Sequence, residues 1–400
     1  MKVALAHDWL VRYRGGEKVL AAICEMYPDA DLFTLVHAPG AVPAHVENRR
    51  IHTSFLQRIP GIEYRYRSFL PLFPTAIEAF RLEGYDLVIS SSHCVAKGIR
   101  KPPNARHLSY VHAPMRYMWD RFDDYFAPGR APPATRLAAN AIRPWLQRWD
   151  RQSARGVDHF VANSHYIAEK VAWLYGRQAS VVAPPVDLRR FAALPLEGAG
   201  RGGYFLWVGA FVPYKRLDLA LEAFSRLGLP LWVVGSGPGL NGVSRCAPSN
   251  VRILGQVPDH ELATVYRDAR ALVFTAEEDF GIAPLEAQAA GRPVIAFRGG
   301  GALETLTPET ALFFSSQSAD ELIASILQLD SWEKSFDPSL ARANASRFSK
   351  ERFQQRFASE VERVLGRANQ RHGVTEMSVD PGGGREDCEG PRAGADSGRT

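Results

Sequence analysis

Two glutamates separated by seven residues give the clearest chemical signal in the sequence. Glu278 and Glu286 bracket the turn EDFGIAPLE, which follows an apolar run and begins a helical stretch. Gly281 lets the backbone approach a ligand closely, and the free N–H groups at the helix start, near Phe280, Gly281 and Ile282, suit a phosphate. Flanking carboxylates accept hydrogen bonds from sugar hydroxyls. The pattern predicts a sugar-phosphate site, whereas two isolated glutamates would indicate a loop acid and a first-turn acid favoured by the helix dipole.

Polar and glycine residues near the start of the chain form a second candidate cluster. His7 and Asp8 end a strand-like run, and ligands of parallel α/β sheets bind at the carboxyl ends of the strands. Asp8 is therefore a candidate for orienting an acceptor hydroxyl, with a helix N-cap as the equal alternative. In the following loop, Gly15 and Gly16 allow backbone N–H groups to meet a phosphate or sugar, unless they form only a tight turn.

These candidates are positioned by short apolar runs that alternate with helical stretches. Such runs are typical of a parallel sheet that is buried on both faces. The predicted strands of the first half are KVALAH (2–7), DLFTLV (31–36), DLVISSS (86–92), HLSYVHA (107–113) and HFVANS (159–164). Those of the second half are YFLWVGA (204–210), LPLWVVGSG (229–237), VRILGQV (251–257), ALVFTA (271–276) and RPVIAF (292–297).

The small residues AALPLEGAGRGG interrupt this alternation and indicate a linker. We therefore predict an α/β chain with two doubly wound, Rossmann-like domains that face each other across a cleft. The predicted boundaries are an N-terminal domain at 1–190, a linker at 191–203, a C-terminal domain at 204–347, an amphipathic helix at 348–366 and a disordered tail at 367–400.

Composition excludes several classes of protein. The chain has 400 residues, 46% hydrophobic and 23% charged, which fits a globular protein of two or three domains and excludes collagen, coiled coil and wholesale disorder. The net charge of +5 is mild; it suits anionic small molecules or an anionic membrane surface and is low for a nucleic-acid binder. The four cysteines have no short spacing, so we expect no disulfide framework or cysteine zinc site. Without a signal-peptide core or a spanning apolar run, we expect a cytoplasmic protein, at most peripheral on a membrane.

The glutamate turn resembles the signature of retaining GT-B glycosyltransferases of family GT4. Matching segments follow in order and spacing: VGAFVPYKRLDLALEAF (208–224), LWVVGSGP (231–238), LGQVPDHELATVYRDA (254–269) and GRPVIAFRGGGALE (291–304). The segments HDWLVRYRGGEKVL and VHAPMRYMWD resemble bacterial mannosyltransferases that build O-antigen and exopolysaccharide. The resemblance implies a GT-B fold with an acceptor-binding N-terminal domain, a donor-binding C-terminal domain and a last helix that returns to the first domain.

The resemblance also assigns individual residues. Lys215 matches the family's lysine for the donor phosphate, and His112 matches its cleft-facing histidine near the donor sugar, although a lone histidine is often structural. The family places an arginine directly after the glycine at Gly209, but this sequence has Ala210 there. Arg216, next to Lys215, is then the candidate for the missing positive charge.

The reaction implied is transfer of a hexose, with mannose from GDP-mannose favoured, to a hydroxyl of a lipid-linked or growing polysaccharide with retention of configuration. Glu286 would hold the ribose, Glu278 would orient the hexose, and the backbone near Val257 would meet the base. We expect no metal and no cofactor, because Lys215 and helix N-termini carry the positive charge. Three alternatives remain: a UDP-sugar-dependent relative, a GT-B epimerase or phosphorylase, and a catalytically silent protein that only binds a nucleotide sugar. Ala210, in place of the arginine, favours the last of these.

Three other motifs resemble known binding motifs, but we do not predict a binding site at any of them. Asp29-Ala30-Asp31 spells the D-x-D of metal-dependent glycosyltransferases but lies beside an early strand, so we predict a solvated turn. The glycines of GSGPG (235–239) lack the next glycine of a dinucleotide fingerprint, so NAD is not expected. His107 and His112 do not have the spacing of a helical zinc site.

A basic, aromatic stretch at 49–80 leaves two interpretations open. It contains five arginines among Phe and Tyr side chains, which suits contact with anionic lipid. The alternative is an irregular helical insertion that covers the sheet. A second basic stretch, RPWLQRWDRQSAR (143–155), adds weak support for the membrane, as do the polyprenyl-diphosphate-linked acceptors that the resemblance implies.

Overall fold

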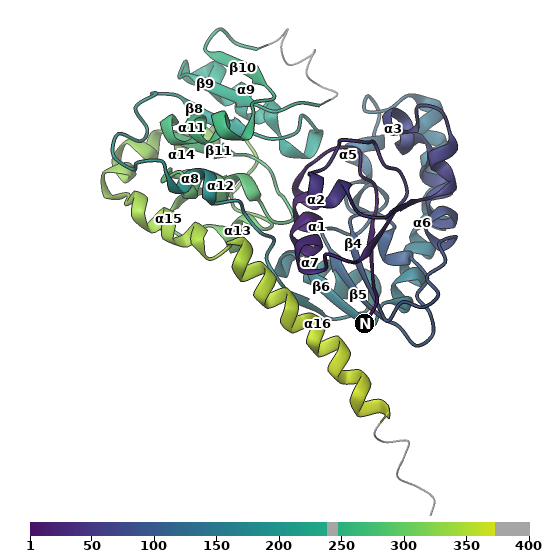
Figure 1. The fold of residues 1–400 in the computed structure, drawn as a ribbon. Helices are drawn as coiled ribbons and strands as arrows, with labels where there is room; N and C mark the ends of the chain where they lie inside the picture. Colours follow the sequence, from purple (N-terminus) through teal and green to yellow (C-terminus); the bar gives the residue numbers. More distant parts are fainter. Residues whose placement is uncertain (238–246, 373–400) are drawn as a thin grey trace, which may run out of the picture.

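Two α/β lobes make up the computed structural model, which describes residues 1–237 and 247–372 (Figure 1). The N-terminal lobe is built on a seven-stranded parallel sheet of order β3-β2-β1-β4-β5-β6-β7. Its strands are β1 (Val3–His7), β2 (Asp31–Thr34), β3 (Ile51–Thr53), β4 (Leu87–Ser92), β5 (Arg106–Val111), β6 (His159–Ala162) and β7 (Ala179–Val181).

The C-terminal lobe repeats this design with a six-stranded parallel sheet of order β10-β9-β8-β11-β12-β13. Its strands are β8 (Phe205–Val208), β9 (Leu231–Val234), β10 (Val251–Gly255), β11 (Ala271–Phe274), β12 (Val294–Phe297) and β13 (Ala311–Phe314). In both sheets the chain starts in the middle, moves to one edge, and returns to continue on the other side. The predicted fold of two doubly wound sheets is therefore confirmed.

Each sheet has a topological switch point, between β1 and β4 in the first lobe and between β8 and β11 in the second. Open α/β sheets bind ligands at this point, outside the carboxyl ends of the strands. The register pairs His7 with Ser91 at the first switch point. These two points locate the candidate site.

Helices cover both faces of each sheet. The N-terminal lobe has α1 (Gly15–Met26), α2 (Ala44–Glu47), α3 (Ile62–Arg65), α4 (Phe73–Glu78), α5 (Phe122–Phe126), α6 (Pro133–Ser153) and α7 (His165–Tyr175). The C-terminal lobe has α8 (Arg189–Ala192), α9 (Leu217–Leu227), α11 (Asp259–Asp268), α12 (Ile282–Ala289), α13 (Ala302–Thr305), α14 (Ala319–Trp332) and α15 (Pro338–Ser346). Short 3-10 helices are η1 (Phe55–Arg58), η2 (Tyr66–Leu72), η3 (Ala96–Gly98), η4 (Arg116–Met118), η5 (Ala154–Gly156), η6 (Pro213–Lys215) and η7 (Glu333–Ser335).

The alternation of side chains along buried strands explains the two cores of the first lobe. Ala4 and Ala6 of β1 pack in one core cluster, while Val3 and Leu5 pack in the cluster on the opposite face. Because both faces are apolar, the strand has no polar face to show to solvent.

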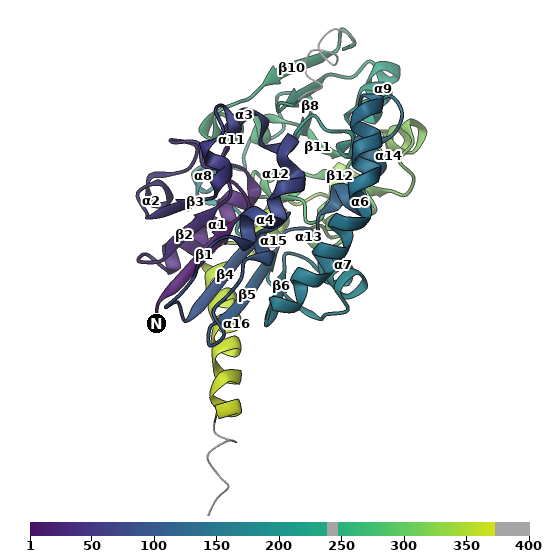
Figure 2. The same ribbon diagram turned by 90° about the vertical axis from the view of Figure 1, so that its right-hand side faces the viewer.

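The last helix, α16 (Lys350–His372), runs from the C-terminal lobe along the N-terminal lobe (Figure 2). Phe353 and Phe357 of α16 are buried in the core cluster that also contains α1 and strand residues of the first sheet. The expected return of the last helix to the first domain is confirmed. The helix passes the predicted boundary at 366, and the rest of the predicted tail, 373–400, lies outside the described residues.

Three strands, β3, β7 and β13, were not predicted from the sequence. Strand β3 lies inside the basic stretch 49–80, and β13 is a run of only four apolar residues. The rest of 49–80 forms short helices, and Leu56, Ile62 and Phe73 from it are buried in a core cluster. This stretch therefore forms the irregular helical insertion that was one of its two interpretations.

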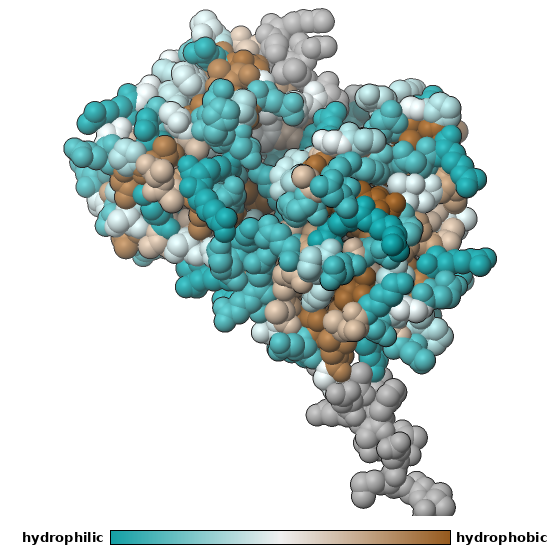
Figure 3. All heavy atoms as spheres, in the orientation of Figure 1, coloured by the Kyte–Doolittle hydropathy of each residue, from teal (hydrophilic) through white to brown (hydrophobic). Residues whose placement is uncertain are grey.

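Hydrophilic residues cover most of the face shown in Figure 3, and hydrophobic residues form separate patches on both lobes. Across the described residues, no helix combines the length and the apolar character that crossing a bilayer requires.

Candidate active site

Lys215 and Glu278 meet at the switch point of the C-terminal sheet. Lys215 follows β8 and Glu278 follows β11, the two strands on either side of that point. The Lys215 Nζ contacts Oε1 of Glu278, and each side chain is 16% exposed. Burial acts to lower the pKa of Lys215, but the Glu278 carboxylate outweighs it and raises that pKa above its ordinary value. The site therefore keeps a positive charge beside a carboxylate.

A glycine loop packs against the backbone that carries Glu278. A Cβ on Gly300 would lie 2.3 Å from the Glu278 carbonyl oxygen, and one on Gly301 would lie 2.3 Å from Cα of Phe280. The Gly301 N–H also donates to the Glu278 carbonyl at 2.8 Å. Only glycine permits this approach, so the segment GGG holds the glutamate turn in place.

The helix starts of the two lobes face each other. A Cβ on Gly15, at the start of α1, would lie 3.1 Å from Cδ1 of Ile282, at the start of α12. Gly281 has φ 95° and is the N-cap of α12. No hydrogen bond between described residues uses the N–H groups of 280–282 as donors, which is the usual condition of a helix start that can receive an anion. The side chain of Phe280 instead packs in an apolar cluster.

Glu286, from the first turns of α12, is engaged by two partners. One carboxylate oxygen contacts the guanidinium of Arg190 on α8, and the other accepts the Tyr266 hydroxyl at 2.9 Å. Arg190 also lies 3.4 Å from Asp259 at the start of α11. Val257, predicted to contact the base through its backbone, lies just before α11 and packs on the core of the C-terminal lobe. Arg190 thus connects Glu286, predicted to bind the ribose, with the start of α11 next to Val257, predicted to meet the base.

At the first switch point, Ser91 joins two histidines. Its Oγ lies 2.8 Å from Nε2 of His112 and 3.1 Å from Nδ1 of His7. A Cβ on Gly16 would lie 3.7 Å from both rings, so the start of α1 covers them. Burial, followed by the neighbouring histidines, lowers the pKa of His112 well below its ordinary value. His112 is therefore a neutral hydrogen-bonding group at pH 7. The sequence analysis did not identify Ser91.

Asp8 has a structural role in this geometry. Its carboxylate is fully buried and accepts the backbone N–H groups of residues 93–96 at 2.6–3.0 Å. His93 Nδ1 adds a further contact at 3.2 Å. These bonds occupy both carboxylate oxygens and cap the turn that leads into η3. The geometry favours capping over the acceptor role. The segment that Asp8 caps is the turn before η3, and not the helix that follows Asp8 in sequence.

Arg216 does not extend toward Lys215. It has φ 51°, and its Nε lies 3.1–3.2 Å from both carboxylate oxygens of Asp218, near the surface. The geometry gives no support to the prediction that Arg216 replaces the arginine missing at Ala210. The structure instead brings Arg116 from the other lobe, where it contacts Asp279 beside Glu278. Sequence reasoning quoted Arg116 within VHAPMRYMWD but gave it no role.

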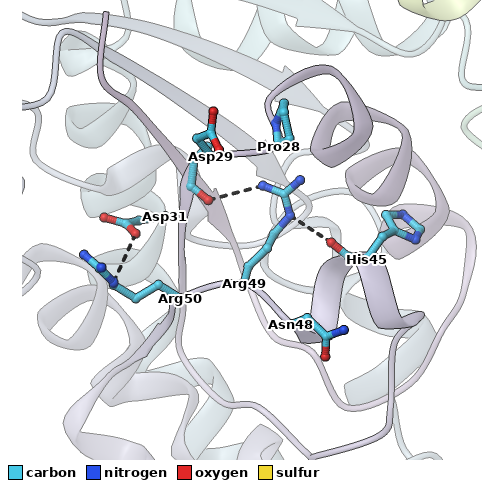
Figure 4. A pocket seen from close by; sticks show the side chains of 8 residues that line it. Pro28, Asp29, Asp31, His45, Asn48, Arg49 and Arg50 are labelled. Atoms are coloured by element: carbon cyan, nitrogen blue, oxygen red, sulfur yellow. Dashed lines mark hydrogen bonds and ion pairs between the residues drawn. The ribbon is translucent and has the colours of Figure 1, made fainter.

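The prediction of a solvated turn at Asp29-Ala30-Asp31 is wrong for Asp31. Asp31 is the first residue of β2; it is buried and contacts the Tyr85 hydroxyl. Figure 4 shows it beside Arg50, at 3.7 Å, in a separate hollow of the N-terminal lobe. In the same view Arg49 is turned to backbone carbonyls, which it binds at 2.6–3.2 Å, so it does not belong to a free basic surface. Within the described ranges, no three His, Cys, Asp or Glu side chains gather in a way that would hold a metal ion.

Comparison with known families assigns both lobes to one group of proteins. Residues 13–190 match the model "Glycosyltransferase Family 4", and residues 202–331 match the model "Glycosyl transferases group 1". Together these matches cover most of both lobes. The chain belongs to glycosyltransferase family 4, as the motifs around Glu278 and Lys215 predicted.

Curated relatives of three kinds resemble parts of the chain. Human GDP-Man:Man(3)GlcNAc(2)-PP-Dol alpha-1,2-mannosyltransferase is 30% identical over 224 residues, which is 48% of this chain and 45% of the relative. D-inositol 3-phosphate glycosyltransferase of Streptosporangium roseum is 32% identical over 185 residues, 38% and 42% of the two chains. O-antigen chain mannosyltransferase C of Escherichia coli is 38% identical over 99 residues, 23% and 27% of the two chains. The chain aligns with less than half the length of each of these relatives.

The fold has solved counterparts. Anabaena HepE in complex with UDP superposes with a TM-score of 0.64, at 17% identity, over 90% of this chain and 100% of that one. At this identity the likeness shows the fold alone, and it confirms the GT-B architecture.

Proposed function

We propose that the protein is a retaining glycosyltransferase that moves a hexose from a nucleotide sugar to a hydroxyl of a lipid-linked or growing glycan. The observation that carries this proposal is the pairing of Lys215 with Glu278 at the carboxyl ends of β8 and β11, opposite the helix start at Gly15. The pairing supplies one cation for the donor phosphates and one carboxylate for sugar hydroxyls.

The main catalytic contribution is stabilisation of the leaving group. As the glycosidic bond to the nucleotide breaks, negative charge develops on the β-phosphate, where Lys215 and the free N–H groups at the start of α12 stabilise it. Glu278 orients the hexose, and neutral His112 hydrogen-bonds it from the other lobe. The acceptor hydroxyl attacks the face that the nucleotide leaves, and its proton passes to the departing phosphate oxygen. In this scheme protein groups alone supply the positive charge, with no metal or cofactor.

Mannose from GDP-mannose is the donor that we propose. The segments near Gly15 and His112 resemble bacterial mannosyltransferases, and two of the relatives are named as mannosyltransferases, one with GDP-Man in its name. A UDP-sugar donor is the second candidate, because the fold relative HepE was solved with UDP. Glu286 would contact the ribose of either nucleotide, after exchanging part of its contact with Arg190.

A cytoplasmic protein in peripheral contact with an anionic membrane would give access to a lipid-linked acceptor. Large apolar side chains of the N-terminal lobe are exposed on the two basic segments or beside them, among them Tyr64, Leu72, Leu137 and Trp145. Such side chains near arginines suit a lipid interface.

Thermal stabilisation by nucleotides tests this function. The purified chain is heated with GDP, UDP, ADP and their sugar conjugates, each in the presence of EDTA. A shift with GDP and GDP-mannose alone supports the proposed donor and metal-free binding. A shift with UDP keeps the family and excludes mannose, and no shift with any nucleotide favours a protein without transferase activity.

A further inference from the structure

Among the described residues, the neighbours of Gly209 and Lys215 in the sequence bring no second positive charge to the donor-phosphate site. The position after Gly209 is Ala210, and the adjacent Arg216 is bound to Asp218. A nucleoside diphosphate carries more negative charge than Lys215 alone compensates, and buried charges require compensation. A second cation from another element would complement Lys215 and the N–H groups at the start of α12.

Arg116 is the cation that the structure brings to this place. It begins η4 in the N-terminal lobe, yet its guanidinium contacts Asp279, the neighbour of Glu278, and lies 5.5 Å from the ring of Tyr214, the neighbour of Lys215. Its side chain is 24% exposed. Its charge also acts on the pKa of Lys215, in the lowering direction.

Asp279 is itself held from the N-terminal lobe, which fixes where Arg116 can lie. The Asp279 carbonyl accepts the Ser164 hydroxyl at 2.6 Å, and its carboxylate lies 3.8 Å from Lys170 Nζ. Ser164 is the N-cap of α7, so its position is set by that helix. Arg116 has five N–H donors in a rigid fork, and Asp279 occupies only one side of it.

We propose that Arg116 is the second cation of the donor-diphosphate site, supplied by the N-terminal lobe and oriented by Asp279. This inference rests on the proposed function. Its consequence is that the full positive charge is assembled only when the two lobes are together, because Lys215 belongs to one lobe and Arg116 to the other.

The test compares nucleotide affinity with and without the phosphates. Wild-type protein, Arg116→Gln and Arg121→Gln are titrated calorimetrically with GDP, UDP, guanosine and uridine. Arg121 is the matched control: it also reaches the C-terminal lobe, donating to the Glu277 carbonyl at 2.9 Å and carboxylate at 3.2 Å, and it lies 5.9 Å from the Tyr214 ring, but it does not contact Asp279. Circular dichroism verifies that each variant is folded.

We expect Arg116→Gln to weaken binding of the diphosphate about tenfold or more while changing binding of the nucleoside less than about twofold. Arg121→Gln should keep diphosphate affinity within about twofold. If Arg116→Gln does not fold, Arg116→Lys replaces it; this variant keeps a charge without the planar fork, and diphosphate binding should weaken about threefold.

Three results would overturn the inference. Unchanged diphosphate affinity in Arg116→Gln, or in Arg116→Lys where that variant replaces it, would show that Arg116 does not bind the diphosphate. An equal loss of affinity for diphosphate and nucleoside would mean that Arg116 maintains the structure of the site and does not bind the phosphates. An equal loss in Arg121→Gln assigns the effect to closure of the lobes. In each case wild-type binding of GDP or UDP leaves the proposed function standing, whereas a wild type that binds neither nucleotide overturns the proposed function as well.

Discussion

The ammonium group of Lys215 contacts Oε1 of Glu278, so the cation that follows β8 is paired with the carboxylate that follows β11. In the proposed function a nucleotide sugar replaces both halves of this pair: its diphosphate would bind the lysine, and its sugar hydroxyls would bind the glutamate. Neither charge is then left buried and unpaired, which would be costly. On this proposal the ion pair prepares the site for a ligand that carries both groups.

Replacing Lys215 by Gln should lower turnover by about 2 kcal/mol or more, roughly thirtyfold, because the leaving group loses its nearest cation. Steady-state hexosyl transfer measures the effect. The matched control is Arg226→Gln in the same lobe, whose guanidinium is half-exposed and paired with Asp320 at 2.6 Å. Near-normal turnover of the Lys215 variant would assign stabilisation of the leaving group to other residues.

Arg216→Gly should leave turnover within about twofold of wild type and should not destabilise the protein. Arg216 has φ 51°, and the left-handed region costs a non-glycine residue roughly 1 kcal/mol. The exposed pair with Asp218 that is lost contributes about as little as other surface pairs. A large loss of turnover in this variant would show that Arg216 contributes to the donor site after all.

Much of the fold followed from the sequence because buried parallel strands are continuous apolar runs. The resemblance to family GT4 assigned Lys215 and Glu278 to one donor site, and the structure shows that each follows a strand beside a switch point. Strands β3 and β7 were missed because three residues are too few to show a period, and β13 was missed although all four of its residues, ALFF, are apolar.

Side-chain direction could not be predicted from the sequence. Arg216 is adjacent to Lys215 in the chain, but its left-handed backbone and Asp218 turn it away. Arg116 lies in the other lobe, and only the packing of α7 and η4 against the glutamate turn brings it to Asp279. The spacing of residues along one chain carries no information about such contacts between lobes.

Glu286→Gln should destabilise the protein by about 3 kcal/mol, because it leaves the mostly buried guanidinium of Arg190 with only the exposed carboxylate of Asp259, at 3.4 Å. Tyr266→Phe is the matched control; it removes only one hydrogen bond to the same carboxylate and should cost about 1 kcal/mol. Urea denaturation measures both values. GDP affinity should also fall in Glu286→Gln if this residue holds the ribose, and unchanged affinity would remove that role.

Acidification should weaken the fold through buried histidines. Burial, the largest influence, lowers the pKa of His107 to about 4, and its Nε2 hydrogen-bonds Ser90 Oγ at 2.8 Å. In the unfolded chain the pKa is near 6.5. The unfolded state therefore binds more protons between these values, and stability that is complete above pH 6.5 is lost as the pH falls toward 4, by up to about 1.4 kcal/mol per pH unit.

Urea denaturation of wild type and His107→Gln from pH 7.5 to pH 4 measures this contribution. The variant should lose less stability over that range than wild type does. His260→Gln is the control, because the His260 side chain is 82% exposed and should leave the pH dependence unchanged. Parallel pH profiles for wild type and His107→Gln would contradict the assignment to His107.

Gly301→Ala should abolish most of the activity without removing a single functional group. The added Cβ would lie 2.3 Å from Cα and 2.5 Å from the carbonyl oxygen of Phe280, and backbone atoms have no rotamer with which to yield. The glutamate turn must then move, which displaces Glu278 from Lys215 and the helix start of α12 from the donor phosphates. A misplacement of about 1 Å is enough to cost roughly a hundredfold in rate. Gly156→Ala is the matched control, since a Cβ there meets nothing within 4 Å. If Gly301→Ala turned over donor as fast as Gly156→Ala, the glycine loop would not be what holds Glu278 in place.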